Sequence, residues 1–192
     1  YKAWSEFAHT QTRRNTAKDF DVKYALTAVH NLAAALDAVH QAGHRVGDVN
    51  ESNVFVGSQA DVMIVDADSA QIGQGDAMFP CLVGKAEYTA PELSHGSLRT
   101  QTRTQESDVF AFAVMTYQML TGGAHPTDAI MKNDEHLTIV EKIRAEIYPA
   151  LSRSSVADAP PRVATVGIPS AITDIIRRSL SVNVSSRPSL HE

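Results

Sequence analysis

Three oxygen-bearing side chains stand at a spacing that suits phosphoryl transfer. Asp48 and Asn53 lie five positions apart in the stretch VGDVNESNVFV, and Asp66 closes the short apolar run MIVD. A carboxylate can orient an attacking hydroxyl group, while an amide oxygen and a second carboxylate can hold Mg²⁺ against phosphate oxygens. If the chain between them folds as a tight hairpin, the three side chains converge on one cleft. The pattern therefore predicts a phosphoryl-transfer site.

The elements that must position these side chains follow from hydrophobic periodicity. Residues 21–42 repeat apolar side chains every three or four positions, which predicts a helix that ends at Gly43. Two short apolar runs, 53–56 and 62–65, flank a polar turn and predict a pair of strands. Such a hairpin would bring the residues at its two ends next to each other.

The rest of the chain is predicted to be mostly helical. Residues 66–107 show little periodicity and predict a long ordered loop. From Asp108 onward apolar residues face almost every direction, as in a helix buried at the centre of a domain. Shorter amphipathic patterns predict helices over 135–147 and after Ser170, which could cap the last one. Residues 1–20 are polar and irregular. The expected fold class is therefore mainly α, with a small β-hairpin that carries the chemical groups.

Length, charge and cysteine content narrow the class of protein. The chain has 192 residues, of which 43% are hydrophobic and 20% charged, and this composition suits one globular domain. A net charge of −5 argues against a nucleic-acid surface, which is usually basic. No apolar run approaches the roughly 18 residues of a membrane span, and no signal peptide is recognisable. Cys81 is the single cysteine, so an internal disulfide is excluded and a reducing, cytoplasmic setting is expected.

Five segments, in the correct order, resemble the C-terminal lobe of a eukaryotic-type (Hanks-like) protein kinase over residues 24–192. They are AVHQAGHRVGDVNESNVFV with VGD where His-Arg-Asp is usual, VDADS in place of the Asp-Phe-Gly segment, GKAEYTAPEL, the central-helix segment SDVFAFAVMTYQMLTGGAHP, and SSRPSL. One D-x-x-x-x-N pattern alone would be a weak signal, whereas the ordered set is strong. The G-D-x-N-x-x-N and D-x-D-S patterns resemble an atypical bacterial branch of that superfamily.

The resemblance implies catalytic roles for matching residues. Asp48 would be the catalytic base that orients the acceptor hydroxyl, and Asn53 and Asp66 would hold Mg²⁺ beside the phosphates of ATP. The activity implied is transfer of a phosphoryl group from Mg-ATP to a serine or threonine hydroxyl of a protein. The substrate protein is not identified by any of these residues.

Two further roles implied by the resemblance are architectural. Glu92 and Arg187 would form a buried ion pair that anchors the stretch between Asp66 and Glu92, the activation segment of such kinases, which is called the 66–92 segment below. Asp108 would cap the central helix and bond to the backbone of the loop that carries Asp48.

Several positions depart from the usual kinase pattern. Asn50 stands where protein serine/threonine kinases place a Lys that touches the transferred phosphate, so Asn50 and Lys85 are further candidate catalytic residues. Lys85 stands where a Thr is usual, and its ammonium group either restores positive charge near the γ-phosphate or faces solvent. Asp68 replaces a glycine, and it either joins the metal site or bonds to a nearby backbone amide.

Regulation by phosphorylation is not expected in the 66–92 segment. Gly47 stands where many kinases have an Arg that meets a phosphorylated residue of this segment. Apart from Tyr88, the segment offers only the hydroxyl groups of Ser69 and Thr89. We therefore expect that phosphorylation of the segment does not switch the activity.

The other half of a kinase ATP site is not found in the sequence. The Gly-rich loop, the strand Lys and the helix Glu precede the catalytic loop in the family, and none of them precedes Asp48 here. We therefore expect residues 1–20 to be a polar lead-in after an N-terminal lobe that is missing, and residues 21–192 to be the C-terminal lobe. The chain alone would be inactive, whereas the intact protein would be a kinase.

Two other functions stay open from the sequence. The fold could serve as a pseudokinase or scaffold, because Gly47, Asn50 and Asp68 depart from the usual pattern. A small-molecule phosphotransferase of the aminoglycoside-kinase type also carries G-D-x-x-x-x-N, and VGDVNESN alone does not exclude it. The GKAEYTAPEL segment argues against this third function, because it resembles the peptide-substrate platform of protein kinases.

Overall fold

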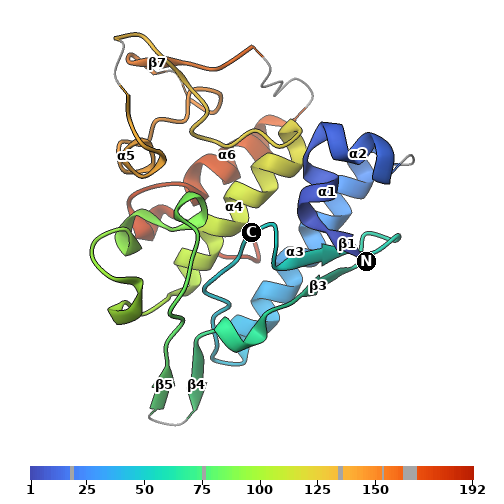
Figure 1. Ribbon diagram of the computed structural model, residues 1–192, viewed down its shortest axis with the longest axis vertical. Coiled ribbons are helices and arrows are strands. Elements are labelled where there is room, and N and C mark those ends of the chain that lie inside the picture. The colour runs from blue at the N-terminus through green and yellow to red at the C-terminus, as the bar shows by residue number, and fades with distance from the viewer. Residues whose placement is uncertain (18–19, 75–76, 134–135, 153, 162–167) are drawn as a thin grey trace.

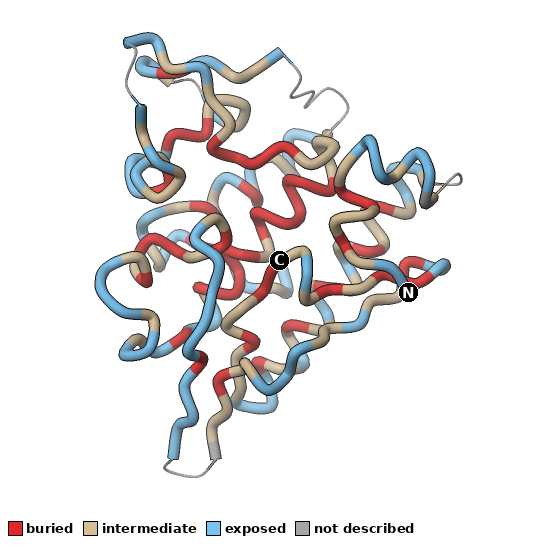
Figure 2. The backbone as a smooth tube through the Cα atoms, viewed as in Figure 1, coloured by how far each residue is buried: buried red, intermediate tan, exposed pale blue. Residues whose placement is uncertain are grey.

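A computed structural model describes residues 1–17, 20–74, 77–133, 136–152, 154–161 and 168–192. The described part is mainly α, as predicted, with small sheets at its edges (Figure 1). Two long helices form its centre: α3 (Val22–Gln41) and α4 (Gln105–Thr121). Figure 2 shows that α4 is buried along most of its length, because apolar side chains cover nearly all of its faces.

The ends of the two central helices are defined by caps. Asp21 accepts a hydrogen bond from the Tyr24 amide at the start of α3. Thr104 and Ser107 form a reciprocal capping box at the start of α4. The prediction that Asp108 caps this helix was therefore wrong: α4 begins three residues earlier, and Thr104 takes that place. Its C-terminal end is at Gly122, which has a φ of +77°.

The first residues of the chain form regular structure, contrary to the prediction of an irregular segment over 1–20. They comprise β1 (Lys2–Ala3), α1 (Trp4–Ala8) and α2 (Thr10–Thr16). Trp4 is fully buried and donates from Nε1 to the Met115 carbonyl of α4 at 3.3 Å. The single tryptophan of the chain therefore fastens α1 to the central helix, and Trp4, Phe7 and Ala8 belong to the same hydrophobic core.

The predicted hairpin is present and has gained a third strand. Strand β2 (Val54–Val56) pairs with β3 (Val62–Ile64) in antiparallel register, Val54 opposite Ile64, and β1 pairs with the other edge of β2. Val54 and Val56 are buried. This register holds the residue before β2 beside the residue after β3, and it thereby sets the distance between Asn53 and Asp66.

The 66–92 segment and the C-terminal half contain shorter elements. Strands β4 (Ile72–Gln74) and β5 (Ala77–Phe79) form a projecting hairpin, followed by 3₁₀ turns η2 (Ala86–Tyr88) and η3 (Pro91–Leu93). Farther on lie β6 (Ile130–Met131), α5 (Ile139–Arg144), β7 (Ala157–Asp158) and α6 (Ser170–Ser179). Helix α5 is shorter than the predicted 135–147, of which residue 135 lies outside the described residues. Ser170 is the first residue of α6 and not its cap. None of the described helices has the length and apolar character needed to cross a membrane.

Candidate phosphoryl-transfer site

The loop over residues 46–53, called the 46–53 loop, holds Asp48 in a fixed orientation. The Asn50 side-chain amide donates to Asp48 Oδ1 at 2.9 Å, and the Asn53 side-chain amide donates to Asp48 Oδ2 at 3.1 Å. Both amides also donate to the Asp48 carbonyl at 3.0 Å. Each carboxylate oxygen therefore has a neutral donor, which fixes the side chain without neutralising its charge.

Asn50 serves the loop as a structural clamp. Its side chain is fully buried, and its amide oxygen accepts from the Ser52 backbone N–H at 2.9 Å. Its backbone carbonyl accepts from the Asn53 N–H at 3.0 Å. The kinase resemblance made Asn50 a candidate catalytic residue at the place of an absent Lys, and the structure shows that its side chain shapes the turn around Asp48.

Asp66 lies at the same end of the hairpin as Asn53. The Val65 N–H donates to the Asn53 carbonyl at 2.9 Å, so the two strands stay paired up to the residue before Asp66. Asp66 itself has a φ of +64° and a ψ of +43°, a left-handed conformation that few non-glycine residues adopt. The Ser69 hydroxyl donates to the Asp66 carbonyl at 2.8 Å and to Oδ2 at 2.9 Å, which stabilises this turn. Strain held at a defined position is common at functional sites.

The donor set fits a hard divalent cation shared with phosphate. Asn53 uses its side-chain N–H₂ group toward Asp48, and this leaves its amide oxygen for a cation, while Asp66 offers an exposed carboxylate. Among the described residues no three His, Cys, Asp or Glu side chains cluster as an all-protein metal cage would require. Mg²⁺ is usually bound by one or two carboxylates together with substrate phosphates, so two protein oxygens are sufficient. Asp68 lies exposed in the 3₁₀ turn η1 (Ala67–Ser69) after Asp66.

Asp108 supports the start of the 46–53 loop from within α4. Its carboxylate accepts from the backbone N–H groups of Val46 at 3.0 Å and Gly47 at 2.9 Å. The His40 ring lies 2.9 Å from the same carboxylate, and both side chains are almost fully buried. The predicted bond from Asp108 to this loop is therefore present, although its predicted role as a helix cap is not.

Lys85 reaches the 46–53 loop from the 66–92 segment. Its Nζ donates to the Ser52 hydroxyl at 2.7 Å, although the residue is exposed. Its carbonyl accepts from the Thr89 hydroxyl at 2.8 Å, which orders the turn that follows. The ammonium group thus stands beside the loop that carries Asp48 and does not simply extend into solvent.

Glu92 and Arg187 form a bidentate ion pair at the end of the 66–92 segment. Both carboxylate oxygens of Glu92 lie 2.7 Å from guanidinium nitrogens of Arg187. The Arg187 side chain is fully buried and also donates to the carbonyls of Ser181 and Glu106, each at 2.9 Å. The neighbouring Tyr88 is buried too; its hydroxyl donates to Gln118 at 3.0 Å, and burial raises its pKa. This end of the segment is therefore firmly fixed to the helical body.

Sequence reasoning missed Cys81 and Arg103, which touch the 46–53 loop at Gly47, and Gln71, which holds Arg103. Arg103 and Gln71 are almost fully buried, and Cys81 has no exposed surface. The only signal in the sequence was Gly47 itself, where a large side chain is usual. Nothing in the spacing of the chain connects that glycine with partners more than 30 and 50 positions away.

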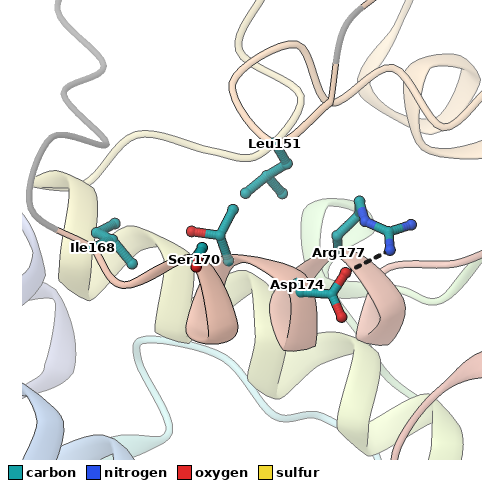
Figure 3. A pocket seen from close by; sticks show the side chains of 6 residues that line it. Leu151, Ile168, Ser170, Asp174 and Arg177 are labelled. Carbon is teal, nitrogen blue, oxygen red and sulfur yellow. Dashed lines mark hydrogen bonds and ion pairs between the residues drawn. The ribbon is translucent and has the colours of Figure 1, made fainter.

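A hollow elsewhere on the surface is unrelated to these groups. It lies between Leu151, in the chain that follows α5, and α6. Figure 3 shows Leu151 above Ile168, Ser170 and Asp174. Arg177 at its rim is already paired with Asp174 at 2.6 Å. None of its lining residues belongs to the 46–53 loop or to the 66–92 segment.

The fold and the site define a class: a helical domain of the protein-kinase kind, with an Asp-bearing loop beside an Asp-tipped hairpin. Comparison with known proteins agrees. The family described as "Protein kinase domain" matches residues 4–192. "Protein kinase YegI" of Escherichia coli (strain K12) is 35% identical over 108 residues, 56% of this chain and 17% of that protein. "Probable serine/threonine-protein kinase pknA2" of Bifidobacterium longum is 26% identical over 190 residues, 95% of this chain and 22% of that protein.

The chain belongs to the protein kinase domain family. It spans about a fifth of the length of these two relatives. Their names describe them as protein kinases, and one as a probable serine/threonine kinase.

Proposed function

We propose that the chain is the C-terminal lobe of a cytoplasmic, Mg-ATP-dependent protein serine/threonine kinase. The observation that carries the proposal is the fixed carboxylate of Asp48, held by two asparagine amides, one of them from Asn53, which pairs across the hairpin with the residue before Asp66. The family membership supports phosphoryl transfer, and the name of the Bifidobacterium relative supports a serine or threonine acceptor. We also propose that the Gly-rich loop, the strand Lys and the helix Glu are supplied by another part of the protein.

In this proposal the residues divide the work of phosphoryl transfer. Asp48 accepts a hydrogen bond from the acceptor hydroxyl, aligns its oxygen with the phosphorus atom and takes its proton. Asn53 and Asp66 provide the amide and carboxylate oxygens that hold Mg²⁺. When bound, Mg²⁺ neutralises charge on the phosphate oxygens. The Glu92–Arg187 ion pair keeps the platform for the protein substrate in register with Asp48.

Lys85 supplies positive charge close to the transferred phosphoryl group. Its bond to Ser52 places the ammonium group beside the 46–53 loop, which has Asn50 where a Lys is usual. We expect Lys85→Ala to lower kcat at least tenfold, since loss of one charged donor at a developing oxyanion commonly costs a few kcal/mol. Lys23→Ala, which removes an exposed Lys of α3, is the control. An unchanged kcat for Lys85→Ala would show that its ammonium group has no role in phosphate transfer.

The decisive experiment compares the intact protein with Asp48→Asn in transfer of phosphate from ATP to dephosphorylated casein. The substitution keeps the shape of the side chain but removes the base, so we expect transfer to fall at least a hundredfold with ATP affinity retained. Asp158→Asn, at an exposed position in β7, should transfer at the wild-type rate. Equal rates for Asp48→Asn and wild type would refute the assignment.

One observation favours a second function, that of a pseudokinase or binding scaffold. Both carboxylate oxygens of Asp48 already accept hydrogen bonds from asparagine amides, and one of these comes from the position usually held by Lys. If the intact wild-type protein binds Mg-ATP but transfers no phosphate to casein, to itself or to aminoglycosides, the scaffold function replaces the kinase. Transfer to aminoglycosides alone would establish a small-molecule phosphotransferase.

A further inference from the structure

The first residue before Asp48 is in direct contact with two distant parts of the chain. Gly47 has a φ of +75°, and a Cβ atom at this position would lie 2.8 Å from the Cys81 Cβ and 3.1 Å from the Arg103 Cγ. Real Cβ atoms essentially never approach other atoms as closely as 2.8 Å. A side chain at position 47 would therefore displace the 66–92 segment, and the glycine lets Cys81 and Arg103 lie directly on the loop.

The backbone of Arg103 is fixed by Gln71, a buried residue near the start of the 66–92 segment. Its N–H donates to the Gln71 Oε1 at 2.7 Å, and its carbonyl accepts from the Gln71 Nε2 at 2.9 Å. Gln71 is 2% exposed, and its backbone exchanges two hydrogen bonds of 2.9 Å with Arg45. The backbone of Arg103 is therefore anchored immediately before α4.

The side chain of Arg103 extends from this anchor to a later part of the 66–92 segment, residues 81–83. Its Nη2 donates to the Val83 carbonyl at 2.6 Å and lies 3.9 Å from the Cys81 sulfur, which itself lies 3.3 Å from the same carbonyl. Arg103 is 3% exposed, and within the described residues no carboxylate forms an ion pair with it. The guanidinium of Arg103 is therefore bonded to the backbone carbonyl of Val83, and charge-assisted hydrogen bonds of this kind are stronger than neutral ones.

Burial does not hold this part of the 66–92 segment in place. Met78, Phe79, Leu82 and Val83 are 44–56% exposed, and the β4–β5 hairpin projects away from the body of the domain (Figures 1 and 2). Cys81 alone is buried between residues 77 and 86. An isolated two-stranded hairpin is at best marginally stable. Residues 81–83 are therefore held by Cys81 above Gly47 and by the bond from Arg103 to Val83.

We propose that Arg103 is a positioning residue that holds residues 81–85 on the 46–53 loop and thereby keeps Lys85 against Ser52 without any phosphate group. The structural part stands on the contacts above, and its catalytic consequence rests on the proposed kinase function. The guanidinium of Arg103, just before α4, orders residues 81–85 in this way. Gly47 of the 46–53 loop has no side chain that could do so.

The experiment uses Cys81 as an internal reporter of segment release. The full-length protein is treated with phosphatase, then with iodoacetamide, and labelling of the Cys81 peptide is followed by mass spectrometry. Arg103→Met keeps the apolar stem but removes the donor, and it should label at least tenfold faster than wild type. Arg99→Met, at an exposed position in η4 (Leu98–Thr100), should label at the wild-type rate, and Arg103→Lys should fall between the two.

Kinetics on the same variants test the catalytic consequence. Arg103→Met should lower kcat for phosphate transfer to dephosphorylated casein at least tenfold while the KM for ATP stays constant, and Arg103→Lys should recover part of the loss. Slow labelling of Cys81 in Arg103→Met, or fast labelling of wild type after phosphatase treatment, would overturn the proposal.

The controls separate the possible failures. If Arg103→Met does not fold by circular dichroism, phosphatase-treated wild type and Arg103→Lys decide the question by the same labelling rates. If wild type transfers no phosphate at all, the proposed function fails, while the labelling rates still support or overturn the positioning role of Arg103.

Discussion

Replacing Glu92 with Ala should destabilise this domain strongly, and the size of the effect can be worked from its geometry. The guanidinium of Arg187 is fully buried, and two bonds of 2.7 Å to Glu92 are its strongest contacts. Breaking a buried ion pair by removing one partner costs about 3–5 kcal/mol, because a charge is left without compensation. Glu92 is 26% exposed, and Arg187 keeps two carbonyl partners, so the lower end, about 3 kcal/mol, is expected.

Urea unfolding measures this cost. With a slope of about 2 kcal/mol per molar urea, a loss of about 3 kcal/mol lowers the midpoint by about 1.5 M. Trp4 is the single tryptophan of the chain and is fully buried against α4, so its fluorescence reports on this core. The slope should not change, since the surface exposed on unfolding stays the same.

The chain offers a matched control for this experiment. Asp174 and Arg177 pair at 2.6 Å, a distance close to that of the Glu92–Arg187 pair, but both side chains are about half exposed. Exposed pairs contribute little, because water solvates each partner when the other is removed. Asp174→Ala should therefore leave the urea midpoint within experimental error. Equal shifts for the two variants would refute the argument that burial, and not the contact distance, sets the cost.

Two further predictions concern a glycine and a histidine. Gly47→Ala should destabilise the domain by about 2–4 kcal/mol, because strain from the positive φ adds to the clash of a new Cβ. Gly43→Ala is the control: its φ is +85° but the space around it is open, so it should cost only about 1 kcal/mol. Thermal denaturation of both variants measures the difference. Burial lowers the pKa of His125 below 6.5, and the ring bonds as a neutral imidazole, with Nε2 donating to the Glu87 carbonyl and Nδ1 accepting from the Thr127 N–H. Below about pH 6.5 the unfolded chain therefore binds a proton at this residue that the folded chain does not bind, so the free energy of unfolding should fall as the pH decreases from 6.5. In His125→Gln the melting temperature should depend less on pH between 7.5 and 5.5 than in wild type. An equally steep dependence would contradict the assignment.

Local patterns in the sequence predicted the elements whose side chains repeat with a clear period. The apolar repeat of residues 21–42 predicted α3 almost to its ends, because Asp21 and Gly43 are strong local signals. The two short apolar runs predicted β2 and β3, since a polar turn separates them. The pairing of Glu92 with Arg187, 95 positions apart, came from the kinase resemblance and not from any local pattern.

Predictions were wrong where a distant partner overrides the local pattern. Residues 1–20 are polar on average, yet Trp4 and Phe7 are buried because α4 and the edge of β2 lie next to them. The start of α4 was predicted at Asp108, where the apolar pattern begins, and the kinase resemblance implied that Asp108 caps it. In the fold that carboxylate is occupied by the 46–53 loop, and Thr104 caps the helix instead.

The sequence by itself determined the chemical groups and their order: the spacing of Asp48, Asn53 and Asp66, the helical core, and the likeness to the protein kinase family. Only the tertiary structure decided how the loop around Asp48 is held. Asn50, Asp108 and Arg103 contact it from two residues to more than fifty residues away, and such contacts leave no periodic trace in a chain. The physical reason is that spacing along the chain encodes local conformation, whereas packing of a glycine against a buried arginine depends on elements that meet only after folding.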